Sequence, residues 1–476
     1  MAETLKPDIC VIGGGSGGLS VAAAAAAFGV PVVLIERGKM GGDCLNTGCV
    51  PSKALLAAAK RAETMRAAAA FGVKAQAVDV DFAKVHDHVR YVISAIAPTD
   101  SAERFTGLGV RVIKGHARFK DRRTVVVGDD YEIRARRFVI ATGSMPARSP
   151  IPGLDEGPYL TNETVFDLTE RPDSLIIIGA GPIGLEMAQA FRRLGSAVTV
   201  LEAATPLGKD DPECAAIVID QLQREGVVIH SGVNVTRVAY GTDSVRAMFV
   251  GANGDQTVEG QYLLVAVGRQ PTTGGLDLES ARIKYDRAGI RVNKKLKTSN
   301  RRVYAIGDCA AGQLQFTHAA NYHAGLVIRN ALFHLPVKVD NDRIPWVTYT
   351  EPELAQTGMT EAQARARKLK FHILRWPYHD NDRAQAERET HGHIKVITGR
   401  KGRILGATIV GAQAGELIAL WTLAIAQGLC IRDLTGIVLP YPTLSEIGKR
   451  AAIDYFVPSL TNPWVRRIIS WVRIFG

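Results

Sequence analysis

Short apolar runs recur along the 476-residue chain, and the first of them opens a familiar pattern. The segment Asp8–Ile12 is apolar and ends in glycines, which is typical of a buried parallel strand. The alanine-rich stretch Leu19–Phe28 predicts a helix. Pro31–Ile35 predicts a second strand. Together these segments predict one βαβ unit.

The same pattern returns in the middle of the chain. Ser174–Ile178 predicts a strand, Leu185–Leu194 a helix and Ala197–Leu201 a further strand. Between the two copies, Arg136–Ile151 contains a predicted strand followed by a proline-rich linker, which indicates a domain crossing. The chain therefore carries two copies of one unit.

After the second copy the sequence pattern changes. Leu263–Val267 and Val303–Ile306 predict strands that are each followed by glycine, but beyond about residue 340 strands alternate with helices and no glycine fingerprint returns. We predict an α/β fold with two Rossmann-like dinucleotide-binding domains and a C-terminal α/β domain. The predicted regions are 1–150 and 276–340 (first nucleotide domain), 151–275 (second nucleotide domain), 341–460 (C-terminal domain) and 461–476 (tail).

Each copy places a Gly-x-Gly-x-x-Gly turn between strand and helix, with an acid eighteen residues after the last glycine. The first glycine makes the tight turn, the second admits a pyrophosphate, the third lets the helix pack on the strand, and the acid binds a ribose. The helix N-terminus offers free N–H groups to the phosphates. The residues are Gly13, Gly15, Gly18 and Glu36 in the first copy, and Gly179, Gly181, Gly184 and Glu202 in the second. Two complete copies predict two bound nucleotides.

The acid of the second copy also bears on the choice of nicotinamide coenzyme. Glu202 repels a 2′-phosphate, and the following Ala203, Ala204 and Thr205 offer no arginine to receive one. Lys209 is the nearest cation and lies further along the loop. We therefore expect NAD(H) to be preferred over NADP(H).

Two cysteines, Cys44 and Cys49, are separated by four residues just before an alanine-rich helix. A structural zinc site usually pairs cysteines two to four apart with a second ligand pair, and no such pair is present. A thiolate at a helix N-terminus is favoured by the helix dipole. The pair can close into a disulfide, so we expect a redox centre here.

Composition excludes several other classes of protein. The net charge is +11, but the basic residues are scattered, so we expect no nucleic-acid partner. Six cysteines are too few for a secreted disulfide scaffold, and no signal core or membrane-spanning apolar stretch is present. His391 and His393 alternate along a predicted strand with no third ligand nearby, so we expect no metal site. A cytoplasmic protein is the simplest expectation.

With these motifs the chain resembles the class I pyridine nucleotide–disulfide oxidoreductases, such as dihydrolipoamide dehydrogenase, glutathione reductase and mercuric reductase, over nearly its whole length. The likeness rests on Cys-x4-Cys, Ala141-Thr-Gly143, Gly268-Arg269, Ala305-Ile-Gly-Asp308 and Pro345-Trp-Val-Thr-Tyr-Thr350. It implies FAD and NAD cofactors, and a homodimer formed through the C-terminal domain. Electrons would pass from NADH through FAD to the Cys44–Cys49 disulfide, and on to a thiol- or disulfide-type acceptor.

The resemblance also implies roles for single residues. Cys49 would be the charge-transfer thiol that faces the flavin, and Cys44 the interchange thiol that attacks substrate. Lys53 would lie near flavin N5 and pair with Glu186. The other implied contacts are those of FAD with Ala117, Gly143, Asp308 and Thr317, and those of NAD with Val235 and Gly268.

The sharpest departure from the family pattern is Tyr441. Disulfide reductases of this family carry a His-Pro dipeptide there, and the histidine, with an acid matched here by Glu446, acts as general base across the dimer. A phenol with a pKa near 10 is a poor base at neutral pH. Mercuric reductases resemble the chain in having this tyrosine, but they also carry a C-terminal cysteine pair, whereas the last cysteine here is Cys430. A mercuric (metal-ion) reductase is therefore the alternative.

The tail beyond residue 461 lies outside the resemblance. As a helix it would place an apolar face opposite Arg466, Ser470 and Arg473, and a basic amphipathic segment with tryptophan suits a membrane surface. The tail could equally pack on the dimer. A membrane-docked electron-relay subunit with weak soluble turnover, peripheral to the inner face of the membrane, is the second alternative. The apolar residues are Trp464, Ile468, Trp471, Val472 and Phe475.

Overall fold

The computed structural model describes residues 2–74, 77–252, 254–460 and 462–475. The chain forms two compact units, one of residues 1–203 with 227–341 and the other of residues 204–226 with 342–476. Segment 204–226, which lies within the predicted second nucleotide region, thus clusters with the C-terminal part of the chain. The finer division into functional regions stays a prediction.

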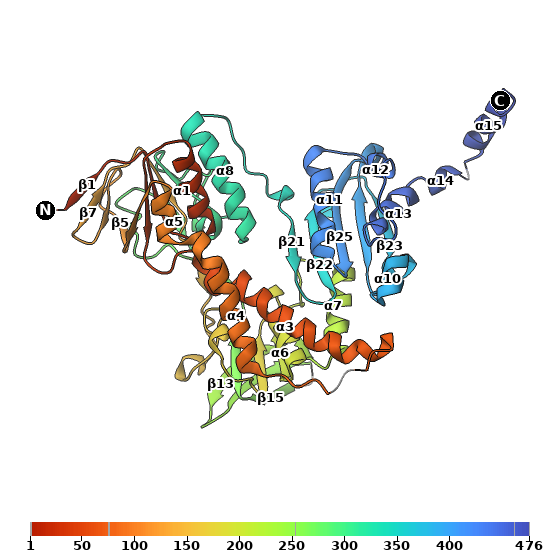
Figure 1. The fold of residues 1–476 in the computed structure, drawn as a ribbon, viewed down its shortest axis with the longest axis horizontal. Helices are drawn as coiled ribbons and strands as arrows, with labels where there is room; N and C mark the ends of the chain where they lie inside the picture. Colours follow the sequence, from red (N-terminus) through yellow and green to blue (C-terminus); the bar gives the residue numbers. More distant parts are fainter. Residues whose placement is uncertain (1, 75–76, 253, 461, 476) are drawn as a thin grey trace. The chain divides into compact units, whose positions relative to one another are not determined.

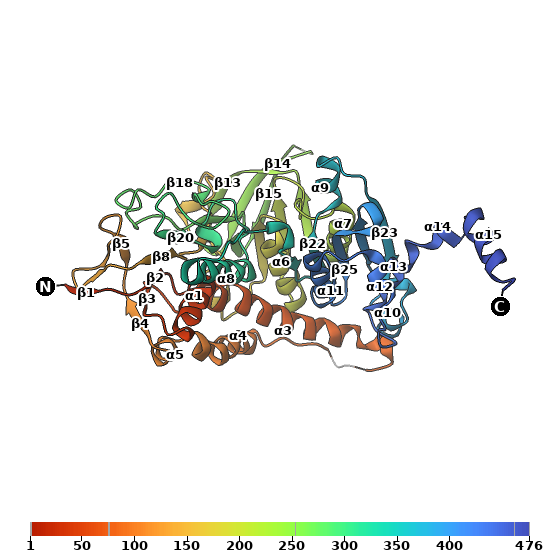
Figure 2. The same ribbon diagram turned by 90° about the horizontal axis from the view of Figure 1, so that it is seen from above.

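The first predicted βαβ unit forms the centre of a five-stranded parallel sheet in the first unit. Its strands are almost fully buried, as expected for apolar runs covered by helices on both faces. Helices α1 and α8 lie side by side in both ribbon views (Figures 1 and 2). In sheet order the strands are β20 (Val303–Ala305), β8 (Arg137–Ile140), β2 (Ile9–Ile12), β3 (Val32–Glu36) and β4 (Val110–Lys114); the helices are α1 (Ser16–Ala27) and α8 (Thr317–Phe333).

The second predicted βαβ unit forms a separate four-stranded parallel sheet in the same unit. Helix α6 (Pro182–Leu194) follows its central strand and buries most of its residues. The strand order is β12 (Val228–Ser231), β11 (Ala197–Glu202), β10 (Ser174–Ile178) and β16 (Tyr262–Val265). Both nucleotide motifs therefore begin at the carboxyl end of a central parallel strand, where ligands bind in open α/β sheets.

The rest of the first unit connects and flanks these sheets. Helix α3 packs against both α4 and α6 (Figure 2), so the cysteine-bearing segment is fixed to the second nucleotide motif. The helices are α2 (Gly42–Asn46), α3 (Cys49–Ala67), α4 (Phe82–Ile96) and α5 (Ala102–Gly107); the strands are β1 (Glu3–Leu5), β5 (Ala117–Phe119), β6 (Val125–Val127), β7 (Tyr131–Ile133), β9 (Ser144–Pro146), β13 (Asn234–Tyr240), β14 (Val245–Gly251), β15 (Gly254–Gly260), β17 (Arg269–Pro271), β18 (Tyr285–Asp286) and β19 (Gly289–Ile290).

The second unit is built on a five-stranded antiparallel sheet with its own hydrophobic core, in which Trp421 and Tyr378 are fully buried. Helix α7 packs against β22 and β25 of this sheet. In sheet order the strands are β21 (Trp346–Thr348), β22 (Glu353–Gly358), β25 (Ile404–Gly411), β24 (His393–Thr398) and β23 (His372–Pro377); the helices are α7 (Pro212–Arg224), α9 (Glu361–Ala366), α10 (Asp382–Glu387), α11 (Ala414–Gln427), α12 (Ile431–Thr435) and α13 (Glu446–Asp454).

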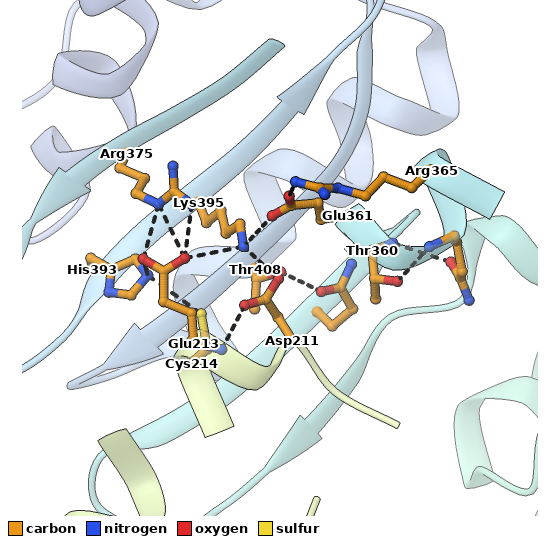
Figure 3. Close-up of polar contacts among 12 residues, drawn as sticks. Asp211, Glu213, Cys214, Thr360, Glu361, Arg365, Arg375, His393, Lys395 and Thr408 are labelled. Atoms are coloured by element: carbon orange, nitrogen blue, oxygen red, sulfur yellow. Dashed lines mark hydrogen bonds and ion pairs between the residues drawn. The ribbon is translucent and has the colours of Figure 1, made fainter. Parts of the chain in front are cut away.

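A cluster of charges attaches α7 to this sheet (Figure 3). The ammonium group of Lys395, on β24, is almost completely buried and lies 2.7 Å from Asp211, 2.7 Å from Glu361 and 3.1 Å from Glu213. The Arg375 guanidinium, on β23, also donates hydrogen bonds to both carboxylate oxygens of Glu213. A buried charge is tolerated when it is paired in this way, and removing one partner typically costs about 3–5 kcal/mol. The cluster therefore holds segment 204–226 in the second unit.

The chain ends in two short helices, α14 (Val457–Leu460) and α15 (Pro463–Val472). Most apolar side chains of α15 are more than half exposed, including Trp464 (68%) and Trp471 (62%). Residues 461 and 476, the first and last of the predicted tail, lie outside the described residues. Among the described residues, no helix combines the length and apolar character needed to cross a bilayer.

Candidate functional site

The two cysteines of the predicted redox pair lie on consecutive helical segments. Cys44 is within α2 and Cys49 is the first residue of α3, a helix of 19 residues. Both are free thiols; Cys44 is half-buried and Cys49 is exposed. The N-terminus of α3 favours a negative charge at Cys49, because the helix dipole and unpaired N–H groups point at it.

The two thiols differ in acidity. The hydrogen bond that Cys44 donates to Cys49 lowers the pKa of Cys49 to about 6, with further help from Thr317 and Lys53. The same hydrogen bond, together with burial, raises the pKa of Cys44 well above that of a free thiol. The Thr317 hydroxyl lies 3.4 Å from the Cys49 sulfur. In the dithiol state at neutral pH, Cys49 is therefore the thiolate and Cys44 keeps its proton.

Lys53 lies one turn after Cys49 on α3 and forms an ion pair with Glu186 of α6. The distance from the Lys53 Nζ to the Glu186 Oε2 is 2.8 Å, and the Glu186 side chain is only 5% exposed. Two residues separated by 133 positions in the sequence are thus brought together by the packing of α3 on α6. This pair places one cation beside the redox helix and joins it to the second nucleotide motif.

The first glycine motif forms a cradle at the N-terminus of α1. The helix begins after Gly15 without a side-chain cap, so its first N–H groups remain available to a phosphate. A Cβ added at Gly18 would lie 1.9 Å from the Gly13 carbonyl oxygen, so only glycine fits there. Glu36, at the end of β3, accepts hydrogen bonds from the N–H groups of Gly14 (2.5 Å) and Gly38 (2.6 Å). This fixes a carboxylate where the fingerprint requires a ribose partner.

The second motif repeats this cradle at the N-terminus of α6. That helix also lacks a side-chain cap, and a Cβ at Gly184 would lie 1.9 Å from the Gly179 carbonyl oxygen. Glu202, at the end of β11, accepts a hydrogen bond of 2.6 Å from the Ala180 N–H. Beyond the chain neighbours of Gly181, no atom of the described residues lies within 4 Å of a Cβ built there. The second glycine thus leaves open space in which a pyrophosphate can approach.

Asp308 lies in a short 3-10 turn, Gly307–Cys309, that follows β20. Ser144 donates a hydrogen bond of 2.6 Å to its Oδ2, and the Arg269 Nε donates one of 2.7 Å to the Ser144 Oγ. Burial raises the pKa of Asp308, and the Ser144 hydrogen bond opposes this. The carboxylate is thus rigidly held at the carboxyl end of the first sheet.

The remaining predicted cofactor residues lie at the ends of strands or inside the sheets. Gly143 and Gly268 follow β8 and β16, and the short ladder of β9 with β17 joins the segments after them. Ala117 is buried in β5, and Val235 lies near the start of β13 and packs on the core around Leu154. Buried Ala117 can contact a nucleotide only through its backbone, and partly buried Val235 only through its backbone or part of its side chain.

Tyr441 and Glu446 both lie in the second unit. Tyr441 is 70% exposed and donates a hydrogen bond of 2.9 Å to Asp382, at the start of α10; this hydrogen bond raises the pKa of the phenol. Glu446 is the first residue of α13. The carboxylate partner of the tyrosine is therefore Asp382, which the sequence did not single out.

The groups at the two glycine cradles fit two dinucleotides. Each cradle offers helix N–H groups, a glycine turn and a fixed carboxylate, as a dinucleotide requires. Within the described part of the chain, no three side chains of His, Cys, Asp or Glu are grouped to bind a metal ion. His393, considered as a ligand above, has its Nε2 3.5 Å from the buried Cys214 sulfur.

Comparison with known families identifies the same architecture. Residues 7–324 match the family described as pyridine nucleotide-disulphide oxidoreductase, and residues 344–452 match the dimerisation domain of that family. The two matches cover both nucleotide motifs, the cysteine pair and the antiparallel sheet of the second unit.

Individual proteins of different activity are equally similar to the chain. A mercuric reductase of Streptomyces lividans and a dihydrolipoyl dehydrogenase of Bacillus subtilis are each 35% identical over 456 residues; the matches cover 94% of this chain, and 95% and 96% of those proteins. The solved structure of the HOCl-induced flavoprotein disulfide reductase RclA from Escherichia coli, 28% identical, superposes with a TM-score of 0.83 over 94% of this chain and 99% of RclA.

Proposed function

Since the chain belongs to the pyridine nucleotide-disulphide oxidoreductases, we propose that it passes electrons from NADH through FAD to the Cys44–Cys49 pair and on to a thiol- or disulfide-type acceptor. The chain is a flavoprotein oxidoreductase that uses a pyridine nucleotide and acts on a sulfur group. The predicted α/β fold and the predicted family are confirmed. The dimerisation domain supports a homodimer.

The unequal acidity of the two thiols is the observation that carries this proposal. A thiolate at Cys49 with a pKa of about 6, beside a protonated Cys44, is the state in which two-electron reduction of a disulfide ends. One sulfur takes up a proton and the other does not. The protonated thiol, on the half-buried α2, is then the one that must be activated to attack an acceptor.

The residues around the pair have separable roles in this scheme. When bound, FAD supplies the two-electron carrier between nicotinamide and disulfide. Lys53 stabilises negative charge next to Cys49, while Glu186 holds the Lys53 ammonium in place. Asp308 and Glu36 orient the polar parts of the flavin nucleotide through carboxylates that are themselves fixed by hydrogen bonds.

NADH rather than NADPH is the proposed coenzyme. The Glu202 carboxylate is held at the end of β11 by the Ala180 N–H, so it cannot move away from a 2′-phosphate without losing that hydrogen bond. A fixed negative charge at the ribose discriminates against a second one through electrostatic repulsion.

A thiophilic metal ion is the second candidate acceptor, and the environment of Tyr441 favours it. The hydrogen bond to Asp382 raises the pKa of this phenol, so still less of it is ionised and able to accept a proton at neutral pH. Reduction of a disulfide needs a proton for the departing thiolate, whereas reduction of a metal ion held by two thiolates needs electrons alone. The similarity to mercuric reductases agrees with this candidate.

An anaerobic titration with NADH tests the proposed function. The protein should accept more than the two electrons that reduce a flavin, and the first two should produce a long-wavelength band from Cys49 thiolate and oxidised flavin. Cys49→Ser should bind flavin normally and accept only two electrons without this band. Uptake of two electrons by the unaltered protein would exclude a redox-active pair. Turnover with lipoamide, oxidised glutathione, Hg(II) and a quinone then ranks the acceptors.

We also propose that the tail contacts an anionic membrane surface. Most apolar side chains of α15 are exposed, and the Arg467 guanidinium lies over the Trp464 ring, 5.6 Å from its centroid. No acidic residue follows Asp454, whereas the tail holds three arginines. A basic helix with exposed tryptophans binds best at the boundary of anionic headgroups and acyl chains.

Sedimentation with lipid vesicles tests this contact. The full-length protein should sediment with vesicles that contain phosphatidylglycerol and not with vesicles of phosphatidylcholine alone. Removing residues 462–476 should abolish sedimentation and leave flavin content and dimer unchanged. Loss of the dimer on truncation would show instead that the tail packs on the protein.

A further inference from the structure

Arg269 lies between two carboxylates that belong to different parts of the redox site. Its Nη2 is 3.1 Å from the Oδ2 of Asp43, the residue just before Cys44, and its Nε is 3.8 Å from the Oδ2 of Asp308. The arginine side chain is only 13% exposed. One buried cation is therefore shared between the cysteine loop and the turn that carries Asp308.

The position of the guanidinium is fixed by neutral hydrogen bonds as well as by charge. Its Nε donates to the Ser144 Oγ at 2.7 Å and its Nη2 to the Ser144 carbonyl at 3.0 Å. Strand β17 begins at Arg269 and pairs with β9, which begins at Ser144. The planar group of an arginine is well suited to such a multiple contact, and a lysine cannot reproduce it fully.

Asp43 is fixed in the same way on its other side. Its Oδ1 accepts hydrogen bonds from the Thr47 hydroxyl at 2.7 Å and from the Asn162 amide at 3.1 Å. The Asn162 amide also donates to the Thr47 carbonyl at 3.2 Å, so the loop between the two cysteines is anchored to a residue more than a hundred positions away. These hydrogen bonds fix the carboxylate of the residue that directly precedes Cys44.

The charge of Asp43 acts against the thiolate. It contributes to raising the pKa of both Cys44 and Cys49, whereas Lys53 lowers that of Cys49. The charged groups around the pair, taken from every element that packs there, are Asp43 on α2, Lys53 on α3, Glu186 on α6, Arg269 on β17 and Asp308 in the turn after β20. Arg269 is the cation that balances Asp43.

We propose that Asp43 and Arg269 are opposed positioning residues that set the reduction potential of the Cys44–Cys49 disulfide. The inference rests on the proposed redox function of the pair. Reduction breaks the S–S bond with two electrons, which originate from NADH; one sulfur takes up a proton and the other remains a thiolate. A carboxylate next to that thiolate disfavours the reduced state, and a guanidinium that neutralises the carboxylate favours it.

If this arrangement sets the potential, neutralising Asp43 and neutralising Arg269 should shift the reduction potential of the disulfide in opposite directions. Asp43→Asn should make the disulfide easier to reduce, because the thiolate no longer faces a negative charge. Arg269→Gln should make it harder to reduce, because Asp43 is left unbalanced. We expect each equilibrium constant against dithiothreitol to change by about tenfold, which is about 30 mV for a two-electron couple. Arg269→Lys keeps the charge and should shift the constant less than Arg269→Gln.

The experiment equilibrates the flavin-loaded protein with dithiothreitol buffers at neutral pH and measures free thiols by alkylation and mass spectrometry. Thr47→Val is the matched control, since it removes a hydrogen bond from Asp43 without changing any charge, and should shift the constant less than twofold. If Arg269→Gln does not retain flavin, the direction in which Asp43→Asn shifts the equilibrium constant decides the outcome. Unchanged constants, or shifts of the same sign in both charge variants, would overturn the inference. A complete lack of a reducible disulfide in the unaltered protein would overturn the proposed function instead.

Discussion

The two glycine motifs have nearly the same local geometry but different surroundings. In both, the third glycine lies where a Cβ would meet the carbonyl oxygen of the first at 1.9 Å, and in both a glutamate at the end of the next strand accepts a backbone N–H near 2.5 Å, from Gly14 at 2.5 Å and from Ala180 at 2.6 Å. The local sequence thus forms the same phosphate cradle twice.

The difference lies at the second glycine of each motif. Gly15 forms an isolated bridge to Gly41, and a Cβ at the neighbouring Gly42 would lie 2.7 Å from the Gly15 Cα. The first cradle is therefore in direct contact with the loop that leads to Cys44. A Cβ at Gly15 would itself meet the Gly42 Cα at 3.7 Å, whereas at Gly181 no atom of the described residues beyond its chain neighbours lies within 4 Å of an added Cβ, so the second cradle is the more open of the two.

Under the proposed function, this contrast separates the nucleotide that stays bound from the one that exchanges. A nucleotide in the first cradle is packed beside the redox loop, as a permanent flavin must be. A nucleotide in the second cradle meets an open face, as a coenzyme that arrives and leaves in each turnover requires. The motif predicts a dinucleotide, and the packing around it decides how that dinucleotide is used.

Adding one methyl group to each cradle should separate the two sites with the largest effect. Gly18→Ala forces a Cβ onto a backbone oxygen, and such overpacking destabilises the local fold by about 3 kcal/mol. This variant should therefore be obtained without flavin. Gly184→Ala should keep its flavin but slow reduction by NADH by more than about a hundredfold, because about 3 kcal/mol corresponds to that factor. Flavin absorbance per protein and stopped-flow reduction measure the two effects.

Gly325→Ala, in α8, is the matched control for these variants. There an added Cβ meets no atom of the described residues within 4 Å beyond the backbone of its own helix and its chain neighbours, so both flavin content and reduction rate should stay unchanged. If Gly18→Ala and Gly184→Ala instead lose flavin to the same degree, the two cradles are not functionally distinct.

Under the proposed function, replacing Tyr441 should change the reaction with the acceptor and leave the reaction with the nucleotide unchanged. Tyr441→His should raise steady-state reduction of lipoamide by at least about tenfold near neutral pH, because general-base assistance is commonly worth two to four orders of magnitude. Flavin reduction by NADH should not change. Tyr441→Phe is the control and should behave like the unaltered protein. If the unaltered protein already reduces lipoamide as fast as its flavin is reduced, the tyrosine is no handicap and the base lies elsewhere.

Replacing Glu202 should have a smaller effect, which changes the preference between NADH and NADPH at the second cradle and nothing at the first. Glu202→Ala should narrow the difference in kcat/KM between NADH and NADPH by about tenfold, or about 1–2 kcal/mol. Glu202→Gln removes the charge but keeps an acceptor for the Ala180 N–H, so it should improve NADPH use with less loss for NADH. Equal use of both coenzymes by the unaltered protein would contradict the proposed preference.

The sequence predicted the parts of the molecule that depend on local patterns. Both βαβ units lie where their apolar runs and glycines predicted them, and Cys44 and Cys49 lie at the predicted helix. The sequence did not reveal which distant side chains meet. The pairs Asp43–Arg269 and Tyr441–Asp382 join residues that no local pattern connects. Asp43 stands next to Cys44, and Arg269 was part of a recognised motif, but only the fold brings their charges together.

The cluster around Lys395 shows the same limit. Lys395 lies within an apolar strand and is buried against three carboxylates from α7, α9 and the loop before α7. Segment 204–226 follows the second nucleotide motif in sequence but belongs to the second unit. Such long-range ion pairs depend on tertiary packing and leave no periodic signal in the sequence.

The spectrum of Cys44→Ser protein is the most direct test of the central claim, that Cys49 is the ionised thiol facing a flavin in the first cradle. Without any reductant, this variant should show a long-wavelength charge-transfer band at neutral to alkaline pH, because a serine hydroxyl can still donate to Cys49, and Thr317 and Lys53 also lower the Cys49 pKa. The band should fade as the pH falls through that pKa, because protonation removes the thiolate. Cys49→Ser should show no band at any pH. A spectrum of simple oxidised flavin in Cys44→Ser at pH about 8 would contradict the account.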